Sequence, residues 1–474
     1  MLSCTSSGVA EPAGCLCHRP EMSAVTRRLG AALSRRSFVA GAAASAVLPK
    51  LAAAQAPTRI VFANVRLFDG KSDALRDGLR VLVDGNRIAS VAQGNPPPPD
   101  GARVIDCGGR VLMPGLIDAH WHAIFAALPL PVLLTAEPSY IQLAASAEAG
   151  RTLMRGFTTI RDLGGPSFAL KQAIDEGLVV GPRVYPSGAM ITASGGHGDL
   201  RPLSDLPSDG KPTLTERTGA GIVVDSPDTI RLRVREQLMQ GASQIKLVGS
   251  GGVSSPRSPL EVASLTEPEL HAAVEATADW QTYVTVHAYT PATIARAIAA
   301  GAQCIEHAHL MDEASARLMA DKGTWLSIRP FLTSEDAPPM TGESQRKMLQ
   351  VFGATDRAYT LARTHKLKIA FGSDLLFSPA LMRRQGTMLT HLSRWFTPVE
   401  VLKMATAVNG ELLALSGPRN PYSGKIGIVE DGALADLLLI DGNPLADLKL
   451  LETPEKNLLV IMKDGKIHKD TLKA

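Results

Sequence analysis

Apolar and polar residues alternate along residues 58–113, in short runs that are separated by turn residues. The runs 60–68 and 81–83 are each followed by an Asp-Gly pair. An alternation of period two that ends in such pairs predicts short antiparallel strands with one buried face. The same pattern returns near the C-terminus, where 437–440 and 458–462 also lead into Asp-Gly pairs. We therefore expect the two ends of the chain to fold together as one small β-sandwich.

The middle of the chain has a different pattern, in which short apolar runs alternate with longer stretches of helical character. Eight runs have the composition of buried parallel strands: 112–117, 158–160, 183–186, 244–248, 283–286, 303–305, 324–328 and 368–371. Eight strand–helix units over about 250 residues is the size of a (β/α)8 TIM barrel. The alternative is a doubly wound open sheet. We expect the barrel.

Helix boundaries in this region carry recognisable signals. The stretches 226–241 and 290–301 each begin with Ser or Thr followed by Pro and end at Gly. Thr266 is followed three residues later by Glu269, which is a capping-box pattern. A polar cap, a proline in the first turn and a terminal glycine predict where a helix starts and stops. These signals predict three helices between the predicted strands.

The patterns divide the chain into three parts. Residues 1–54 form an N-terminal segment, 55–113 and 415–474 form the composite β-sandwich, and 114–414 form the barrel.

Composition and charge narrow the class of protein. The chain is 45% hydrophobic and 20% charged, which is ordinary for a soluble globular enzyme. Residues 1–54 contribute +4 to the net charge of +3, so the rest of the chain is close to neutral, at −1. No basic patch indicates a nucleic-acid partner. Cys107 and Cys304 lie in apolar, strand-like runs, as buried free thiols or as a disulfide pair.

The N-terminal segment resembles a bacterial twin-arginine export signal. Arg35 and Arg36 precede an alanine-rich apolar run, and Ala52 and Ala54 supply an A-x-A cleavage site. The run is too short for a permanent membrane helix, so no stable membrane anchor is expected. The alternatives are a plain Sec signal and a misassigned start site. The resemblance implies the twin-arginine export machinery as a partner and a periplasmic or secreted location.

The candidate chemistry begins at the end of the first barrel strand. His120 and His122 are two residues apart, which places both imidazoles on the same face of a strand. Two imidazoles at a strand end can form part of a metal site, although the pattern alone is weak evidence.

Other strand ends strengthen this interpretation. His287, His307 and Asp374 each stand where a predicted strand gives way to a loop. In a barrel these ends converge on one mouth, where active sites lie. Lys246 lies inside a strand that should be buried, and an unpaired buried ammonium is costly. A special role is therefore expected for this lysine.

In their order along the chain, these histidines, Lys246 and Asp374 resemble the metal-ligand pattern of the binuclear amidohydrolase superfamily. The resemblance runs from about Ile60 to Lys466. It implies two divalent metal ions, the first bound by His120, His122 and Asp374 and the second by His287 and His307. It also implies that Lys246 is carboxylated and bridges the metals, and that Asp374 acts as general base and then acid. Zinc is the expected metal, because the ligands are mostly imidazole. His309 is the alternative to His307, and a metal-free barrel used only for binding is the alternative from another class.

Three residues are candidate substrate contacts. His197 follows the third strand in a Gly-Gly-His-Gly-Asp segment, and the resemblance implies that it contacts the substrate or an oxyanion. Tyr289 and Arg329 could meet a substrate carboxylate. Each has a structural alternative: a solvated loop histidine, a core tyrosine and a structural salt bridge.

The loop around His197 and the strand around Lys246 resemble one branch of the superfamily. This branch contains imidazolonepropionase-like proteins, Xaa-Pro dipeptidases, carboxypeptidase-like enzymes and ochratoxin-hydrolysing amidases. We therefore expect hydrolysis of an amide bond to a C-terminal amino acid, in a dipeptide, an N-acyl amino acid or an ochratoxin-like compound. The alternative is a cyclic-amide hydrolase of the imidazolonepropionase type. Apolar residues near the mouth suit a hydrophobic side chain: Ile124, Phe125, Leu128, Leu375, Leu376 and Phe377. Whether the chain forms homo-oligomers is left open.

Overall fold

The computed structural model describes residues 59–94, 96–207 and 210–472. These residues belong to one compact unit, Thr58–Ala474. The predicted export signal, with Arg35, Arg36, Ala52 and Ala54, lies outside the described residues. Within the described part, no helix has both the length and the apolar character needed to cross a membrane.

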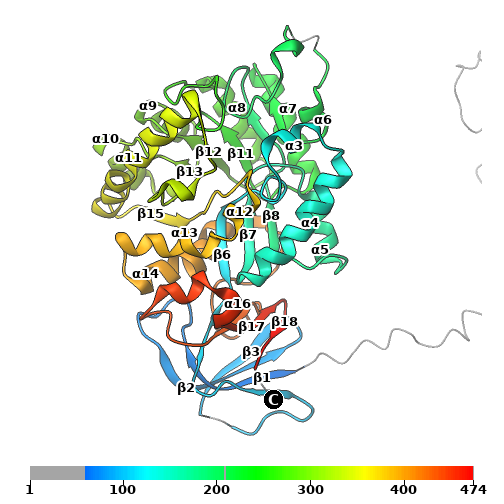
Figure 1. Cartoon of the computed structure of the whole chain (residues 1–474), viewed down its shortest axis with the longest axis vertical. Coiled ribbons are helices and arrows are strands. Elements are labelled where there is room, and N and C mark those ends of the chain that lie inside the picture. The colour runs from blue at the N-terminus through cyan, green and yellow to red at the C-terminus, as the bar shows by residue number, and fades with distance from the viewer. Residues whose placement is uncertain (1–58, 95, 208–209, 473–474) are drawn as a thin grey trace, which may run out of the picture. The chain divides into compact units, whose positions relative to one another are not determined.

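Strands from the two ends of the chain form one eight-stranded sheet. Its strands are β1 (Ile60–Leu67), β2 (Arg76–Asp84), β3 (Arg87–Gln93), β4 (Arg103–Asp106), β5 (Val111–Pro114), β16 (Leu437–Ile440), β17 (Leu458–Lys463) and β18 (Lys466–Asp470). The antiparallel pair β5–β16 joins the N-terminal strands to the C-terminal ones. In Figure 1 the blue strands β1–β3 therefore lie beside the red strands β17 and β18.

The expectation of purely antiparallel pairing is wrong for β1. This strand pairs in parallel with β4 and with β5. The reason is the proline-rich loop after β3, which returns the chain to the start of β1 instead of making a tight turn. Arg80 holds this loop, because its Nη1 donates to the Pro96 and Pro97 carbonyls at 2.8 and 2.9 Å.

The middle of the chain forms two parallel sheets that alternate with helices, which confirms the α/β class. One sheet has the order β6-β7-β8 and the other β10-β9-β11-β12-β13-β14-β15. Their bounds are β6 (Leu116–Trp121), β7 (Phe157–Asp162), β8 (Arg183–Pro186), β9 (Met190–Thr192), β10 (Gly221–Val223), β11 (Ile245–Val248), β12 (Val284–Ala288), β13 (Cys304–His307), β14 (Trp325–Ile328) and β15 (Lys368–Phe371). Most of these strands are buried on both faces, which explains their continuous apolar sequences.

The three-stranded sheet is hydrogen-bonded at both of its edges, β6 and β8, to segments next to strands of the seven-stranded sheet. Beyond β15, the Asp374 amide donates to the His120 carbonyl of β6 at 2.8 Å. Before β11, the Ser243 amide donates to the Pro186 carbonyl of β8 at 2.8 Å. These bonds bring the end of β15 to the end of β6, where the first predicted ligands stand.

The first predicted barrel strand is in fact two strands. The run 112–117 divides at Gly115: β5 belongs to the outer sheet and β6 to the parallel one. A Cβ atom at Gly115 would lie 2.0 Å from Thr158 Oγ1, so only glycine lets the backbone pass this close to β7.

Helices follow most of the parallel strands (Figure 1). Their bounds are α3 (Leu130–Thr135), α4 (Pro138–Met154), α5 (Phe168–Asp175), α6 (Leu214–Arg217), α7 (Pro227–Gln240), α8 (Glu267–Ala278), α9 (Pro291–Ala299), α10 (Glu313–Lys322), α11 (Gly342–Thr364), α12 (Pro379–Met382), α13 (Gln385–His391), α14 (Pro398–Lys403), α15 (Asn409–Ala414) and α16 (Pro454–Asn457). The start signals predicted for α7, α8 and α9 are confirmed, each with a capping box at its first turn. Cys107 and Cys304 are both buried free thiols, so the disulfide alternative is wrong.

Candidate metal centre

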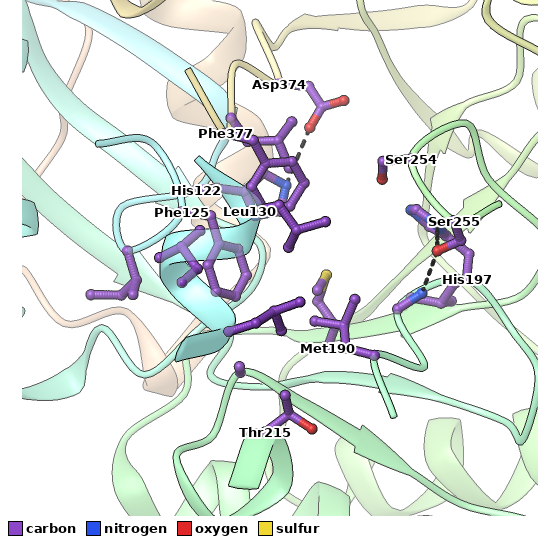
Figure 2. A pocket seen from close by; sticks show the side chains of 18 of the residues that line it. His122, Phe125, Leu130, Met190, His197, Thr215, Ser254, Ser255, Asp374 and Phe377 are labelled. Atoms are coloured by element: carbon purple, nitrogen blue, oxygen red, sulfur yellow. Dashed lines mark hydrogen bonds and ion pairs between the residues drawn. The ribbon is translucent and has the colours of Figure 1, made fainter. Parts of the chain in front are cut away.

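One cavity of about 410 Å³ collects every site residue that the sequence predicted. These residues are His120, His122, His197, Lys246, His287, Tyr289, His307, Arg329 and Asp374. Lys246 lies within β11, His197 lies in the loop after β9, and the others lie at or just beyond the ends of five more parallel strands. In Figure 2, His122 and Asp374 are joined by a dashed line in one part of the cavity, and His197 and Ser255 in another.

Asp374 lies against His120 of β6 and His122, which follows that strand. Its Oδ1 is 3.3 Å from His120 Nε2 and 3.2 Å from His122 Nε2. Ligand atoms of His120, His307 and Asp374 all lie within 4.8 Å of one another. The His287 and His307 rings are 4.4 Å apart between centroids. Imidazoles and a carboxylate at this spacing form a group that could hold metal ions.

Two of the ring nitrogens that would not bind metal, on His120 and His287, have partners of their own. His120 Nδ1 lies 2.8 Å from Glu306 Oε2, and His287 Nε2 lies 2.9 Å from the Gly251 carbonyl oxygen. A carboxylate or carbonyl at one ring nitrogen fixes the hydrogen there and leaves the other nitrogen as a lone-pair donor. The structure thus presents His120 Nε2 and His287 Nδ1 as possible ligand atoms.

Burial keeps the imidazoles of His120, His287 and His307 neutral. It lowers the pKa of His120 to about 4 and the pKa values of His287 and His307 well below their usual range. Because metal binding requires the neutral ring, this set is in the ligand form at neutral pH.

Lys246 stands in the middle of β11 with 2% of its surface exposed. Among the described residues, no carboxylate forms an ion pair with it. Burial lowers the pKa of Lys246, although Glu306 and Asp374 oppose the shift. A buried ammonium without an ion-pair partner is unfavourable, and a neutral amine is the form that reacts with carbon dioxide.

Two of the ligand positions have left-handed backbones. His307 has a φ of 78°, Ala308 of 51° and Asp374 of 48°. Such conformations cost of order 1–3 kcal/mol each and occur mostly where function requires them. At Asp374 the hydrogen bond from its backbone amide to the His120 carbonyl holds the conformation in place.

A buried ion pair beneath the histidines was missed by the sequence analysis. Arg161 Nη2 lies 2.6 Å from Glu306 Oε1, and both side chains are fully buried. Burial alone would raise the pKa of Glu306, but Arg161 and His120 hold it well below its usual range. Glu306 is therefore the carboxylate that orients His120. The sequence contains a signal for this pair, because Arg161 and Glu306 are charged residues within apolar strands, as Lys246 is.

Two of the candidate substrate contacts, His197 and Tyr289, lie beside the imidazole rings of His287 and His307. The His197 ring is 4.7 Å from the His287 ring, and its Nδ1 lies 2.8 Å from Ser255 Oγ. The Tyr289 ring lies 5.0 Å from both the His287 and His307 rings. Burial lowers the pKa of His197 to about 4, so its ring is neutral.

The Arg329 guanidinium is already engaged. Its Nη1 donates to the Asp374 carbonyl at 2.7 Å, and its Nη2 donates to the Asp336 carbonyl. It also lies over the Phe331 ring, 4.3 Å from the centroid. These contacts favour the structural alternative for Arg329, in which it positions the segment that carries Asp374.

His309 lies behind the cavity wall, with its ring 6.2 Å from the His307 ring between centroids. It packs beside Tyr289 and Phe331, its Nε2 lies 2.9 Å from the Arg329 carbonyl, and it does not line the cavity. His307 lines the cavity and lies within the possible ligand group. The geometry thus favours His307 over His309 as a ligand.

The cavity wall is largely apolar. Ile124, Phe125, Leu376 and Phe377 line it, whereas Leu128 and Leu375 are buried elsewhere and the expectation for them is wrong. More of the wall comes from α3 and α4 and from β9, with Leu130, Leu133, Leu134, Ile141 and Met190. Figure 2 shows Leu130, Met190, Phe125 and Phe377 around the same space.

Comparison with known proteins identifies one matching family and several relatives. A family model described as "Amidohydrolase family" matches residues 111–468. An ochratoxinase from Aspergillus niger is 31% identical over 436 residues, covering 88% of this chain and 87% of the relative. A crystal structure described as an amidohydrolase matches with a TM-score of 0.81 and 36% identity, over 88% of this chain and 100% of the other. A prolidase complexed with N-methylphosphonate-L-proline matches with a TM-score of 0.80 and 32% identity, over 87% and 100%.

Proposed function

The chain belongs to the amidohydrolase family and is a hydrolase acting on carbon–nitrogen bonds, and on that premise we propose a more specific activity. It is a binuclear metal-dependent hydrolase that cleaves the amide bond to a C-terminal amino acid. One observation carries the proposal: imidazoles, a carboxylate and a buried lysine without an ion-pair partner among the described residues line one cavity with an apolar wall.

The fold proposed with it is a (β/α)8 barrel. In this proposal β6–β8 and β11–β15 are the eight barrel strands, closed where Asp374 meets β6 and where Ser243 meets β8. The outer sheet made by both chain ends is the small β-domain beside the barrel. The strand-end ligands then share one mouth, as active-site residues of such barrels do.

The proposed ligands fit two metal ions. His120, His122 and Asp374 would hold one ion, His287 and His307 the other, and a carboxylated Lys246 would lie between them. The neutral imidazoles, the oriented ring nitrogens of His120 and His287, and a Lys246 without an ion-pair partner in the described part of the chain support this arrangement. Zinc is the expected metal because imidazole predominates. Bound there, the metals would acidify a water and polarise the scissile carbonyl.

The side chains then have distinct roles. Burial opposes ionisation of Asp374, but His120, His122 and Arg329 hold its pKa below the usual range. Asp374 is therefore ionised at neutral pH, able to accept the proton of the attacking water and to pass it to the leaving nitrogen. His197 donates a hydrogen bond to a substrate oxygen. Glu306 keeps His120 in orientation, and Arg329 holds the backbone at Asp374.

The substrate proposal combines the wall with the polar groups beside it. A hydrophobic side chain fits the apolar wall, and His197 and Tyr289 are donors able to meet a free carboxylate. The relatives agree with this class, since one is an ochratoxinase and another a prolidase bound to a proline derivative. Dipeptides, N-acyl amino acids and ochratoxin-like amides are the proposed substrates.

Amidating the C-terminal carboxylate of a substrate should lower kcat/KM. Because Arg329 is engaged with backbone carbonyls, neutral donors would meet the carboxylate. A hydrogen bond to a charged group contributes about 1.5–3 kcal/mol, which corresponds to roughly 10- to 150-fold in kcat/KM. The measurement is kcat/KM for one N-acyl amino acid as free acid and as amide, with a cyclic ureide assayed alongside. Equal values for acid and amide would favour the imidazolonepropionase-type activity instead.

A further inference from the structure

A buried lysine on α11 holds the loop that follows β11. Lys347 Nζ donates to the carbonyls of Gly252, Ser255 and Ser258, at 2.8, 2.6 and 2.9 Å. Only 3% of the Lys347 surface is exposed. Three carbonyl acceptors use all three hydrogens of an ammonium group, whereas a neutral amine would leave one carbonyl without a donor. Lys347 is therefore charged, and it fixes three points of one short loop.

The same loop carries the contacts of His197. Ser255 Oγ lies 2.8 Å from His197 Nδ1 and accepts a hydrogen bond from the Gly198 amide at 3.3 Å. Gly252 lies directly against the imidazole, since a Cβ atom there would be 2.4 Å from His197 Cγ. Figure 2 shows Ser255 and His197 joined at the edge of the cavity. The position of the ring thus depends on the position of this loop.

The contacts of Ser255 favour one position for the hydrogen of the His197 ring. The Gly198 amide is only a donor, so it uses a lone pair of Ser255 Oγ. Within the described part of the chain, His197 Nδ1 is then the one acceptor in contact with the Ser255 hydroxyl hydrogen. If Nδ1 accepts this bond, the hydrogen of the neutral ring lies on Nε2.

We propose that Lys347 and Ser255 are positioning residues that hold His197 as a fixed Nε2–H donor for a substrate oxygen. Lys347 acts through the loop backbone, and Ser255 acts through its hydroxyl on Nδ1. The inference rests on the proposed function, because it takes this cavity as the place where an amide is cleaved. It adds two residues, Lys347 and Ser255, that would affect activity through His197 and not through the predicted metal ligands.

A double-mutant cycle tests this coupling. Lys347→Met and Ser255→Ala should each lower kcat/KM by about 10- to 100-fold, as loss of a supporting contact does in other sites, with metal content unchanged. The double variant should be no slower than the slower single variant, because both changes release the same histidine. Ser255→Thr retains the hydroxyl and should restore most of the activity. Arg346→Met, at the exposed neighbouring position, is the matched control and should behave as wild type.

Two kinetic results would overturn the proposal: losses that multiply in the double variant, or a Ser255→Ala variant as active as wild type. Ser255→Ala keeps the test decisive if Lys347→Met fails to fold. A second readout needs no substrate: ¹⁵N NMR of the histidine-labelled protein, with the His197 signal identified from His197→Gln. The wild-type ring should carry its hydrogen on Nε2, and a hydrogen on Nδ1 would overturn the proposal even if no amide substrate were found.

Discussion

Lys246→Ala should lose bound metal and activity together. The substitution removes the only proposed bridging ligand, and no neighbouring carboxylate within ion-pair distance is present among the described residues to replace it. The two metal charges would then face each other without an anion between them. Losing the Lewis acid and the acidified water costs several kcal/mol in the transition state, so we expect at least about a 1,000-fold loss in kcat/KM.

The control for this variant is Lys463→Ala. Lys463 is also a buried strand lysine, with 7% of its surface exposed, but it lies in β17 and does not line the cavity. Metal content should be measured on both variants with kcat/KM. Short carboxylic acids should restore part of the metal binding and activity of Lys246→Ala by occupying the vacated space. A Lys246→Ala protein with normal metal content and wild-type turnover would contradict the bridging role.

Asp374→Asn should show the second large effect. The amide is nearly isosteric with the carboxylate but cannot accept the proton of the attacking water. General acid–base catalysis contributes about 10²- to 10⁴-fold, and loss of an anionic ligand adds to this, so kcat should fall by about 1,000-fold or more. KM should change much less, because the cavity wall and His197 are unaltered.

Asp356→Asn is the matched control, because Asp356 is an exposed carboxylate paired with Arg394. The measurement is kcat, KM and metal content for both variants. An Asp374→Asn enzyme within about tenfold of the wild-type kcat would assign the proton transfer to another group.

The strand-end residues could be predicted because their chemistry depends on local pattern. In the structure β11 and β12 pair with Val248 opposite His287, and β12 and β13 pair with Ala288 opposite His307. Parallel register therefore brings the ends of neighbouring strands together wherever the apolar runs are identified correctly. The positions of His120, Lys246, His287, His307 and Asp374 at one cavity follow from that rule.

Contacts between distant segments could not be predicted in this way. Lys347 lies on a long helix with no distinguishing pattern, and its partners are about 90 residues earlier in the chain. The sequence predicts Arg329 as a possible contact for a substrate carboxylate, because strand position does not reveal that its guanidinium donates to backbone carbonyls. The contribution of α3 to the cavity wall likewise depends on how the segment after β6 packs beside the cavity. Such features are set by tertiary packing.

The metal requirement is the central claim, and reconstitution of the metal-free full chain tests it most directly. The protein should be stripped with a chelator, checked for residual metal and titrated with zinc while hydrolysis of an N-acyl amino acid is followed. The proposed function predicts no activity in the stripped protein and a rise that levels off near two zinc ions per chain. Full activity in a sample shown to contain no metal would contradict it.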